Sequence, residues 1–247
     1  MWQSTSGTPP SRNLVLPENE IHVWRAPLAC EEKTLRKLEV TLSSDELARA
    51  NRFFAVRDRS NFIAARGILR ELLGKYQNQA PAKLKFNYSS KGKPSLQPEE
   101  DHASMHFNIS HSHGLALLAF AANRNVGVDV EWVRPSVEVE EIAERYFSPR
   151  EVAELKTLEP SSRTEGFFQC WTRKESYIKA RGEGLHIPLE SFSVSLTPDR
   201  PAVLDSADSS RWKLYSIALD EGYVGALVGA GKDWQPRFLS WTPDLLG

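Results

Sequence analysis

Two segments of the chain repeat their apolar residues with the period of an amphipathic helix. They are "NFIAARGILRELLGKY" (61–76) and "FFQCWTRKESYIKA" (167–180). Residues three and four apart share one face of a helix, so each segment is predicted to form a helix that packs an apolar stripe on a core.

A short β-rich segment and a pair of alternating strands follow each predicted helix. After the first helix come "LKFNYSS" and "SMHFNIS…GLALLAFA", and after the second come "SFSVSLT" and "RWKLYSI…YVGALVG". Alternation of apolar and polar residues on both sides of a turn is typical of a β-hairpin. The order helix, short β segment, hairpin therefore occurs twice.

This order indicates a diverged internal repeat. An offset of 106 residues places Phe62 on Phe168, and an offset of 108 places Gly114 on Gly222. Identity between the copies is low, so the shared order of elements is the stronger evidence. We predict an α+β fold of two similar α/β halves related by a pseudo-two-fold axis, with the cleft between them as the ligand site.

The repeat also predicts the domain boundaries. We expect a flexible N-terminal arm over residues 1–20, an N-terminal half over 21–124 and a C-terminal half over 125–247. The arm has no charged start followed by an apolar stretch, so we do not expect it to be a signal peptide.

Composition excludes several classes of protein. The chain has 247 residues, is 40% hydrophobic and carries a formal charge of −1. The chain contains no window of 18 apolar residues, so we expect no membrane-spanning segment. The balanced charge argues against a nucleic-acid-coating protein. Two cysteines without a pairing pattern suit a reducing compartment. We therefore expect a cytoplasmic protein without a membrane or nucleic-acid partner.

The second predicted helix carries charges within its apolar face. At about 100° per residue, Glu175 and Lys179 fall on the same stripe as Trp171 and Ile178. Burying either charge without a partner costs several kcal/mol. The pair is either a surface i,i+4 pair worth tenths of a kcal/mol, a structural pair at the interface between halves, or part of a site.

The 106-residue offset sharpens this contrast. It aligns Glu175 with Leu69 and Lys179 with Leu73, which resemble ordinary core residues. If the two halves share a fold, a specific role is expected for the charges in the second half.

The strand "VGVDVEWV" (126–133) places two carboxylates on one face. Asp129 and Glu131 are two residues apart, so both project from the same side of the strand. Adjacent carboxylates repel, and a divalent cation such as Mg²⁺ or Mn²⁺ relieves that repulsion through oxygen ligands. The alternative is a solvated face of an edge strand.

Two further groups could bind phosphate. In "FNISHSHG", Ser110 and His111 lie where a strand is expected to end in a turn, and hydroxyl, imidazole and backbone N–H groups there could hold a phosphate. The alternative is ordinary turn chemistry. A scattered basic group comprises Arg49, Arg66, Arg70, Lys91 and Lys93. The alternative for Arg66 is an arginine that extends its side chain along apolar surface to reach water. The alternative for the loop that carries Lys91 and Lys93 is an ordinary polar turn.

Together, the acidic and basic groups suit a ligand with a pyrophosphate and a further phosphate. Three acidic groups could hold a hard cation, and the basic groups could hold phosphates. The combination also suits chemistry at phosphorus, in which positioning and charge neutralisation dominate.

At these residues the chain resembles 4′-phosphopantetheinyl transferases. The signature of that family is G-[IV]-D followed, after a gap of about forty residues, by [FW]-[SCT]-x-K-E-[AS]-x-x-K. This chain has the similar segments "VGVD" and "WTRKESYIK", separated by 41 residues. "KGKP", "FNISHS" and "GVDVE" extend the likeness to the Sfp type, which is a monomeric pseudo-dimer. "LSSDELARANRFF" and "AARGILRELLG" look most like cyanobacterial HetI-like members, and the likeness covers about residues 21–240.

The resemblance implies roles for the residues that match. Asp129, Glu131 and Glu175 match the metal-binding carboxylates, which normally hold Mg²⁺ on the pyrophosphate of coenzyme A. Asp129, Glu175 and Lys179 are the catalytic candidates, and Lys179 matches a lysine that protonates or stabilises the departing phosphate. The implied contacts to coenzyme A are Arg49, Arg66, Lys93, Ser110, His111, Lys174 and Lys179.

One position departs from the family pattern. The basic residue expected three positions before Arg49 is replaced by Glu46, and we expect Arg66 to compensate because of its place on the first helix. The departure falls among the residues expected to contact the 3′-phosphate of coenzyme A.

The resemblance also implies a mechanism and a partner. A serine hydroxyl of an apo acyl or peptidyl carrier protein attacks the β-phosphorus of coenzyme A, and Glu175 takes the proton directly or through a metal-bound water. Mg²⁺ and Lys179 neutralise the charge on the leaving oxygen, and 3′,5′-ADP departs. The segment "WVRPSVEVEEIAERYF" (132–147), with aliphatic residues expected to be exposed beside Arg134, is the predicted landing site for the carrier protein.

Two rival functions remain open from the sequence. A zinc-dependent hydrolase would use the cluster His102, His106, His111 and His113, although no second histidine cluster or cysteine pair completes a shell. A catalytically silent binding module would lack an acidic or lysine position of the signature, yet Asp129, Glu175 and Lys179 are all present.

Overall fold

The computed structural model describes residues 2, 14–89, 92–97, 104–182, 187–197 and 202–246. Its α-helices are α1 (Glu32–Glu39), α2 (Ser44–Ala50), α3 (Val56–Gln77), α4 (Val139–Tyr146), α5 (Pro149–Thr157) and α6 (Pro160–Arg181). Its strands are β1 (Glu20–Pro27), β2 (Phe86–Tyr88), β3 (Pro94–Leu96), β4 (Met105–Ser112), β5 (Leu115–Ala122), β6 (Val126–Trp132), β7 (Ser193–Val194), β8 (Leu204–Asp205), β9 (Trp212–Ile217), β10 (Tyr223–Ala230) and β11 (Gln235–Ser240). Among the described helices, none is long and apolar enough to cross a bilayer.

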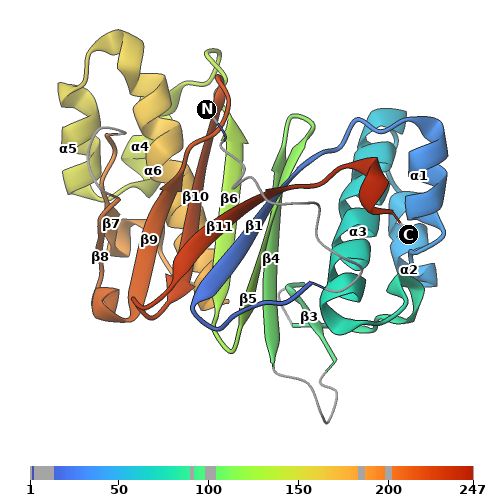
Figure 1. Ribbon diagram of the computed structural model, residues 1–247. Helices are drawn as coiled ribbons and strands as arrows, with labels where there is room; N and C mark the ends of the chain where they lie inside the picture. The colour runs from blue at the N-terminus through green and yellow to red at the C-terminus, as the bar shows by residue number, and fades with distance from the viewer. Residues whose placement is uncertain are drawn as a thin grey trace.

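Two sheets form the centre of the molecule, and helices cover their outer sides (Figure 1). One sheet has the strand order β11-β1-β5-β4 and the other has the order β6-β10-β9. Alternate residues of β5 explain the layers: Leu117 and Ala119 pack in the cluster between the sheets, whereas Leu118 and Phe120 pack in the cluster under α3. The predicted α+β fold of two similar halves is confirmed.

The helices α3 and α6 are counterparts at an offset of 104 residues. Both are 22 residues long, and both end at a left-handed residue, Asn78 for α3 and Gly182 for α6. The offset of 106 predicted from the sequence is therefore wrong for the helices, because apolar residues at a period of 3.6 can be matched in more than one register.

The corrected register changes the counterparts of the charged pair. Glu175 and Lys179 correspond to Glu71 and Lys75 of α3, not to leucines. Both helices thus carry the same i,i+4 pair, and the two halves differ in what faces it.

The difference lies in the strands. Asp129 pairs with Ala226 of β10, and the strand positions equivalent to this pair in the first half are Trp24 and Leu118. Trp24 is fully buried in the core of the first half. An apolar core residue thus takes the place of the strand carboxylate in the first half.

The strand β11 crosses from the second half into the first. It pairs in parallel with β1, and the chain beyond it packs Trp241 and Leu245 into the core of the first half. Figure 1 shows β11, near the C-terminus, lying beside β1, near the N-terminus. Residues 235–246 therefore belong in space to the N-terminal half, which corrects the predicted boundary of a C-terminal half over 125–247.

The predicted N-terminal arm is only partly within the described residues. Residues 1 and 3–13 lie outside them. The indole of Trp2 donates to Ser240 Oγ at 3.1 Å, and the backbone of Leu14 donates to the carbonyl of Lys75 at 3.2 Å. Leu14 is buried and Leu16 packs against the same core, so these two residues anchor the chain before β1.

A chain of hydrogen bonds lies buried beside β1. Trp24 Nε1 donates to Tyr76 Oη at 2.9 Å, and His22 Nδ1 lies 2.6 Å from the same oxygen. His22 Nε2 lies 2.9 Å from Glu20 Oε2. The chain is complete when the imidazole is neutral with its proton on Nε2, since Nδ1 then accepts from the Tyr76 hydroxyl. Burial lowers the pKa of His22, although Glu20 opposes this shift and Arg237 adds to it.

This shift predicts a pH-dependent stability. The unfolded chain binds a proton on His22 near pH 6.5, whereas the folded chain resists it, so the stabilisation is present above that pH and is lost below it. The free energy of unfolding should therefore fall below pH 6.5, with His22 contributing up to about 1.4 kcal/mol per pH unit. The free energy of unfolding is measured with urea at several pH values between 7 and 5. Its decrease with falling pH should be smaller for His22→Gln than for wild type, and equal decreases would contradict the role given to His22.

The helix α6 packs unusually close to β6 because β6 carries a glycine at the contact. A Cβ on Gly127 would overlap the backbone oxygen of Ser176 and the backbone nitrogen of Ala180. Only glycine allows this approach, which brings the α6 face that carries Glu175 next to the Asp129 side of β6.

We expect Gly127→Ala to force α6 away from β6. The overlap involves backbone atoms of a helix, so relief requires displacement and should cost at least about 1–3 kcal/mol of stability. Gly166→Ala, on α6 itself, is the control, because its Cβ would meet the movable end of the Leu158 side chain. Thermal unfolding should show the larger loss for Gly127→Ala, and equal losses would contradict the role of this contact.

Candidate active site

The centre of the site is Asp129, which β6 directs toward α6 and the edge of β4. Asp129 is 3% exposed, and its Oδ1 accepts hydrogen bonds from Ser110 Oγ at 2.7 Å and from Lys179 Nζ at 2.6 Å. Lys179 Nζ also donates to Ser110 Oγ at 3.0 Å and to the carbonyl of Val128 at 3.4 Å. Asp129 Oδ2 is buried and has no hydrogen-bond partner among the described residues.

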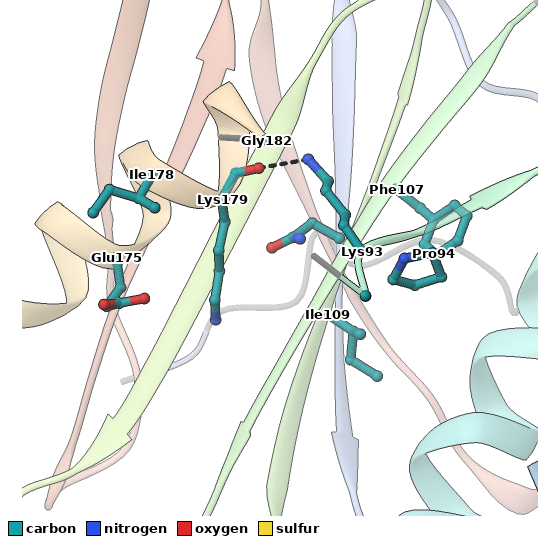
Figure 2. Close-up of a pocket in the computed structure, with 10 residues that line it drawn as sticks. Lys93, Pro94, Phe107, Ile109, Glu175, Ile178, Lys179 and Gly182 are labelled. Carbon is teal, nitrogen blue, oxygen red and sulfur yellow. Dashed lines mark hydrogen bonds between the residues drawn. The ribbon is translucent and has the colours of Figure 1, made fainter. Parts of the chain in front are cut away.

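Glu175 lies one helical turn before Lys179, and Figure 2 shows both side chains leaving α6 in the same direction. Burial raises the pKa of the Glu175 carboxyl, and the negative charges of Asp129 and Glu131 raise it further, while Lys179 opposes them. The carboxyl is therefore more basic than an ordinary glutamate.

Glu131 completes the acidic group. Burial raises its pKa, a hydrogen bond from Ser112 opposes that shift, and the charge of Asp129 adds to it. Within the part of the chain that the structure describes, no three His, Cys, Asp or Glu side chains converge closely enough to form a ready-made metal cage. The three carboxylates are thus an open arrangement, with the Lys179 ammonium at Asp129 Oδ1.

A cavity of about 260 Å³ lies beside these residues, between the two halves (Figure 2). The first half contributes Gly92, Lys93, Pro94, Phe107, Asn108 and Ile109, and the second half contributes Glu175, Ile178, Lys179 and Gly182. Lys93 Nζ donates to the backbone oxygen of Lys179 at 2.5 Å, which ties the β2–β3 hairpin to the last turn of α6. Burial lowers the pKa of Lys93.

Family comparisons match both halves of the chain. Residues 28–123 match the model "4′-phosphopantetheinyl transferase, N-terminal", and residues 125–228 match the 4′-phosphopantetheinyl transferase superfamily. The chain is 44% identical to 4′-phosphopantetheinyl transferase HetI of Nostoc sp., over 93% of this chain and 96% of the relative. The chain belongs to the 4′-phosphopantetheinyl transferase family.

The chain is also similar to other proteins. The transferase is 30% identical to 4′-phosphopantetheinyl transferase Sfp of Bacillus subtilis, over 84% of this chain and 90% of the relative. Among solved structures, the Chronobacterium ammoniagenes ACPS–CoA complex aligns with a TM-score of 0.31 and 23% identity, over 44% of this chain and 98% of that chain.

The structure brings most of the predicted site residues of the transferase together. Asp129, Ser110 and Lys179 share one hydrogen-bond network, and Lys93 and Glu175 line the adjoining cavity. His111 is close enough to Lys179 for the ammonium to add to the lowering of its pKa by the surrounding protein.

The end of β4 differs from the prediction. Ser110 and His111 were expected at a turn, but β4 continues to Ser112 and the turn follows at His113 and Gly114. The Ser110 hydroxyl is therefore held on a strand, where its direction is fixed by the pleat.

Lys174 does not reach the cavity, and its predicted contact with the pyrophosphate of coenzyme A is wrong. The side chain is fully buried on a different face of α6 and pairs with Glu151 at 2.8 Å. Its Nζ also donates to the carbonyls of Leu189 and Phe192, at 2.8 and 2.6 Å. All three donor positions of the ammonium are thus occupied inside the second half.

The first half contains the counterpart of this network. Glu46 corresponds to Glu151, since each glutamate is the third residue of its helix, α2 or α5, and closes a capping box there. Arg70 Nε donates to Glu46 at 2.6 Å, and Arg70 Nη1 donates to the carbonyl of Leu84 at 3.1 Å. Glu46, the departure from the family pattern, is therefore part of a buried ion pair.

Glu46 also forms an ion pair with Arg66. Arg66 Nε donates to Glu46 Oε1 at 2.9 Å, and its Nη2 donates to Tyr88 Oη at 3.0 Å. Burial alone would raise the pKa of Glu46, but Arg66, Arg70 and the backbone N–H of Ser43 together lower it. Arg66 does not line the cavity, so the expected compensation for the missing basic residue is not seen.

Arg49 lies apart, on a shallow pocket of about 470 Å³ lined by Asp45, Arg49, Arg52 and Phe53. Its guanidinium lies 5.4 Å from the centre of the Phe62 ring. Arg52 is a second cation in this pocket that the sequence analysis did not single out. Lys91 of the basic group lies outside the described residues.

Asn108 and Ser112, on the same face of β4 as the predicted Ser110, are site residues that the sequence did not single out. Asn108, Ser110 and Ser112 alternate along the strand, and all three contact β6 of the other half. Asn108 Oδ1 accepts from the backbone of Val128 at 2.9 Å. The period of two in "NISHS" was the available signal.

The zinc alternative gains nothing from the structure. His102 lies outside the described residues, and His106 Nε2 contacts Ser104 Oγ at 3.3 Å. The histidines that the structure describes belong to no group of three potential metal ligands.

Proposed function

We propose that this transferase takes the 4′-phosphopantetheine group from coenzyme A and joins it to a serine hydroxyl of an apo acyl or peptidyl carrier protein. The observation that carries the proposal is the network of Asp129, Ser110 and Lys179 beside Glu175, at a cavity that both halves line. Closely packed cations and carboxylates suit the neutralisation of charge at a transferring phosphoryl group.

Each residue has a distinct part in the proposed reaction. Glu175 accepts the proton of the attacking serine hydroxyl, and its raised pKa makes it a better base than an ordinary glutamate. The serine oxygen bonds to the β-phosphorus as the bond from that phosphorus to the adenylate oxygen breaks. Lys179 neutralises the leaving oxygen of 3′,5′-ADP, and Ser110 and Asp129 hold its ammonium in place.

The carboxylates suit a hard divalent cation. Asp129 Oδ2 is buried without a partner in the described chain, and Glu131 and Glu175 raise the negative charge around it. Oxygen ligands of this kind prefer Mg²⁺ or Mn²⁺. Asp129, Glu131 and Glu175 would hold the ion, which would supply positive charge for the pyrophosphate of coenzyme A. Phosphate oxygens would complete the open arrangement.

The carrier protein is proposed to dock on residues 132–147, but the expectation of exposed aliphatic residues there needs correction. Val139 and Phe147 are buried, and Val137 and Ile142 pack against the core of the second half. Tyr146, at 37% exposed, is the large hydrophobic side chain of this segment that stays accessible.

A reducing compartment and a monomeric state complete the proposal. Cys30 and Cys170 are both free thiols, in line with a cytoplasmic location. Two halves within one chain supply both sides of the cavity, so one copy of the chain suffices for the proposed site.

The test is direct. The purified transferase is incubated with an apo acyl carrier protein or an apo peptidyl carrier protein, coenzyme A and Mg²⁺, and the carrier is weighed by mass spectrometry. We expect the carrier to gain one phosphopantetheine, and chelation of the divalent cation to abolish the gain. Unchanged masses across several carriers would overturn the proposal.

A further inference from the structure

The tip of the β4–β5 hairpin, residues 112–114, is held against the second half by several contacts. The ring of His113 stacks on Trp132 at 4.9 Å with an interplanar angle of 19°. Tyr223 Oη donates to the carbonyl of His113 at 2.8 Å. His113 and Gly114 form the turn with positive φ, at 47° and 85°, and the contacts of His113 place the tip beside the end of β6.

Ser112 is the residue of this tip that contacts the acidic group. Its Oγ accepts a hydrogen bond from the backbone N–H of Trp132 at 3.1 Å and donates to Glu131 Oε2 at 2.8 Å. The Trp132 N–H can only donate, so it leaves the hydroxyl proton of Ser112 free for the carboxylate. The polarity of both bonds is therefore fixed.

This arrangement fixes the rotation of the Glu131 side chain. Glu131 is half-buried at the end of β6, where a glutamate has three rotatable side-chain bonds. With Oε2 held by Ser112, the other carboxylate oxygen, Oε1, remains available to bind a cation. For Oε1, the described residues show no hydrogen bond.

We infer that Ser112 is a positioning residue that presents Glu131 to the divalent cation. The inference rests on the proposed function, because it requires Glu131 to be a ligand of that ion. Hydrogen-bond partners of metal-binding carboxylates orient them, and their loss weakens metal affinity by about 10-fold to 100-fold. Ser112 belongs to the first half and Glu131 to the second, so the cation affinity depends on how the halves fit together.

The experiment compares two side chains of the same shape. Ser112→Val and Ser112→Thr are both branched at Cβ, but only threonine keeps the hydroxyl. Mn²⁺ binding is measured by electron paramagnetic resonance with enzyme and coenzyme A and without a carrier protein. We expect Ser112→Val to bind Mn²⁺ about 10-fold to 100-fold more weakly, and Ser112→Thr to stay near wild type. Ser104→Ala, near the start of the same strand, should also stay near wild type.

A second readout separates positioning from a general structural role. In transfer assays, Ser112→Val should raise the KM for Mg²⁺, while kcat at saturating Mg²⁺ stays near wild type. Melting temperatures of Ser112→Val, Ser112→Thr and Ser112→Ala are measured alongside.

Three outcomes would overturn the inference: wild-type Mn²⁺ affinity in Ser112→Val, equal weakening in the valine and threonine variants, and loss of folding in both Ser112→Val and Ser112→Ala. If wild-type enzyme modifies no carrier, the proposed function fails instead, and the Mn²⁺ measurement, which needs no carrier, still decides the role of Ser112.

Discussion

Glu175→Gln is expected to slow phosphopantetheine transfer by about 10²-fold to 10⁴-fold, the range that one general base supplies. The amide keeps the size of the side chain but cannot take a proton, and it removes a carboxylate from the acidic group. The measurement is the initial rate of carrier modification at saturating coenzyme A and Mg²⁺.

The fold should not suffer from this change. Burial and the charges of Asp129 and Glu131 raise the pKa of Glu175, so its ionised form costs stability at pH values above its ordinary range. Glu175→Gln removes that cost, and its melting temperature at neutral pH should equal or exceed that of wild type. Gain of stability with loss of activity is typical of a group held for chemistry.

The chain offers a matched control for this variant. Glu71 occupies the equivalent position on α3, and burial also raises its pKa. Glu71→Gln should leave the transfer rate unchanged, because the strand position that would face it in the first half is Trp24 rather than an aspartate. A Glu175→Gln enzyme with near-wild-type rate would remove the base from the proposed mechanism.

Lys174→Met is expected to give the largest loss of stability. It leaves the carboxylate of Glu151 buried without its ion-pair partner, and breaking a buried pair in this way typically costs about 3–5 kcal/mol. The carbonyls of Leu189 and Phe192 also lose their donor. Chemical unfolding followed by circular dichroism measures the change.

The double variant Glu151→Gln/Lys174→Met is the control, since removal of both charges should restore part of the stability. The KM for coenzyme A of folded Lys174→Met should stay near wild type, because Nζ faces the interior rather than the cavity. Wild-type stability combined with a raised KM for coenzyme A would instead indicate that Lys174 contacts the pyrophosphate of coenzyme A.

Much of the site could be predicted from the sequence because its residues break the rules of ordinary elements. Glu175 and Lys179 stand out on an apolar helical face, and Asp129 and Glu131 stand out at a period of two on an otherwise apolar strand. Residues that local propensity and burial do not explain mark functional positions.

Lys174 shows where such reasoning ends. It is adjacent to Glu175, yet about 100° of helical rotation directs it into the core instead of the cavity. Its partner Glu151 lies 23 residues away on another helix, and no local pattern connects the two. The resemblance to known transferases supplied a role for Lys174, whereas the buried pair had to be seen in three dimensions.

The parallel pairing of β11 with β1 was likewise beyond the sequence pattern. β11 alternates in burial and β1 is buried on both faces, but such patterns say which faces are buried and not which edge is paired. Contacts between residues more than 200 positions apart, such as Glu20 with Gln235, leave no periodic signal in either segment.

The position of β11 has a consequence for synthesis of the chain. Residues 20–27 leave the ribosome early, but their parallel neighbour, residues 235–240, emerges only after the second half has been made. Until then one edge of β1 is open, and pairing over so long a separation closes slowly. The nascent first half would benefit from a chaperone during this interval, even though the second half can assemble its own three-stranded sheet as it emerges.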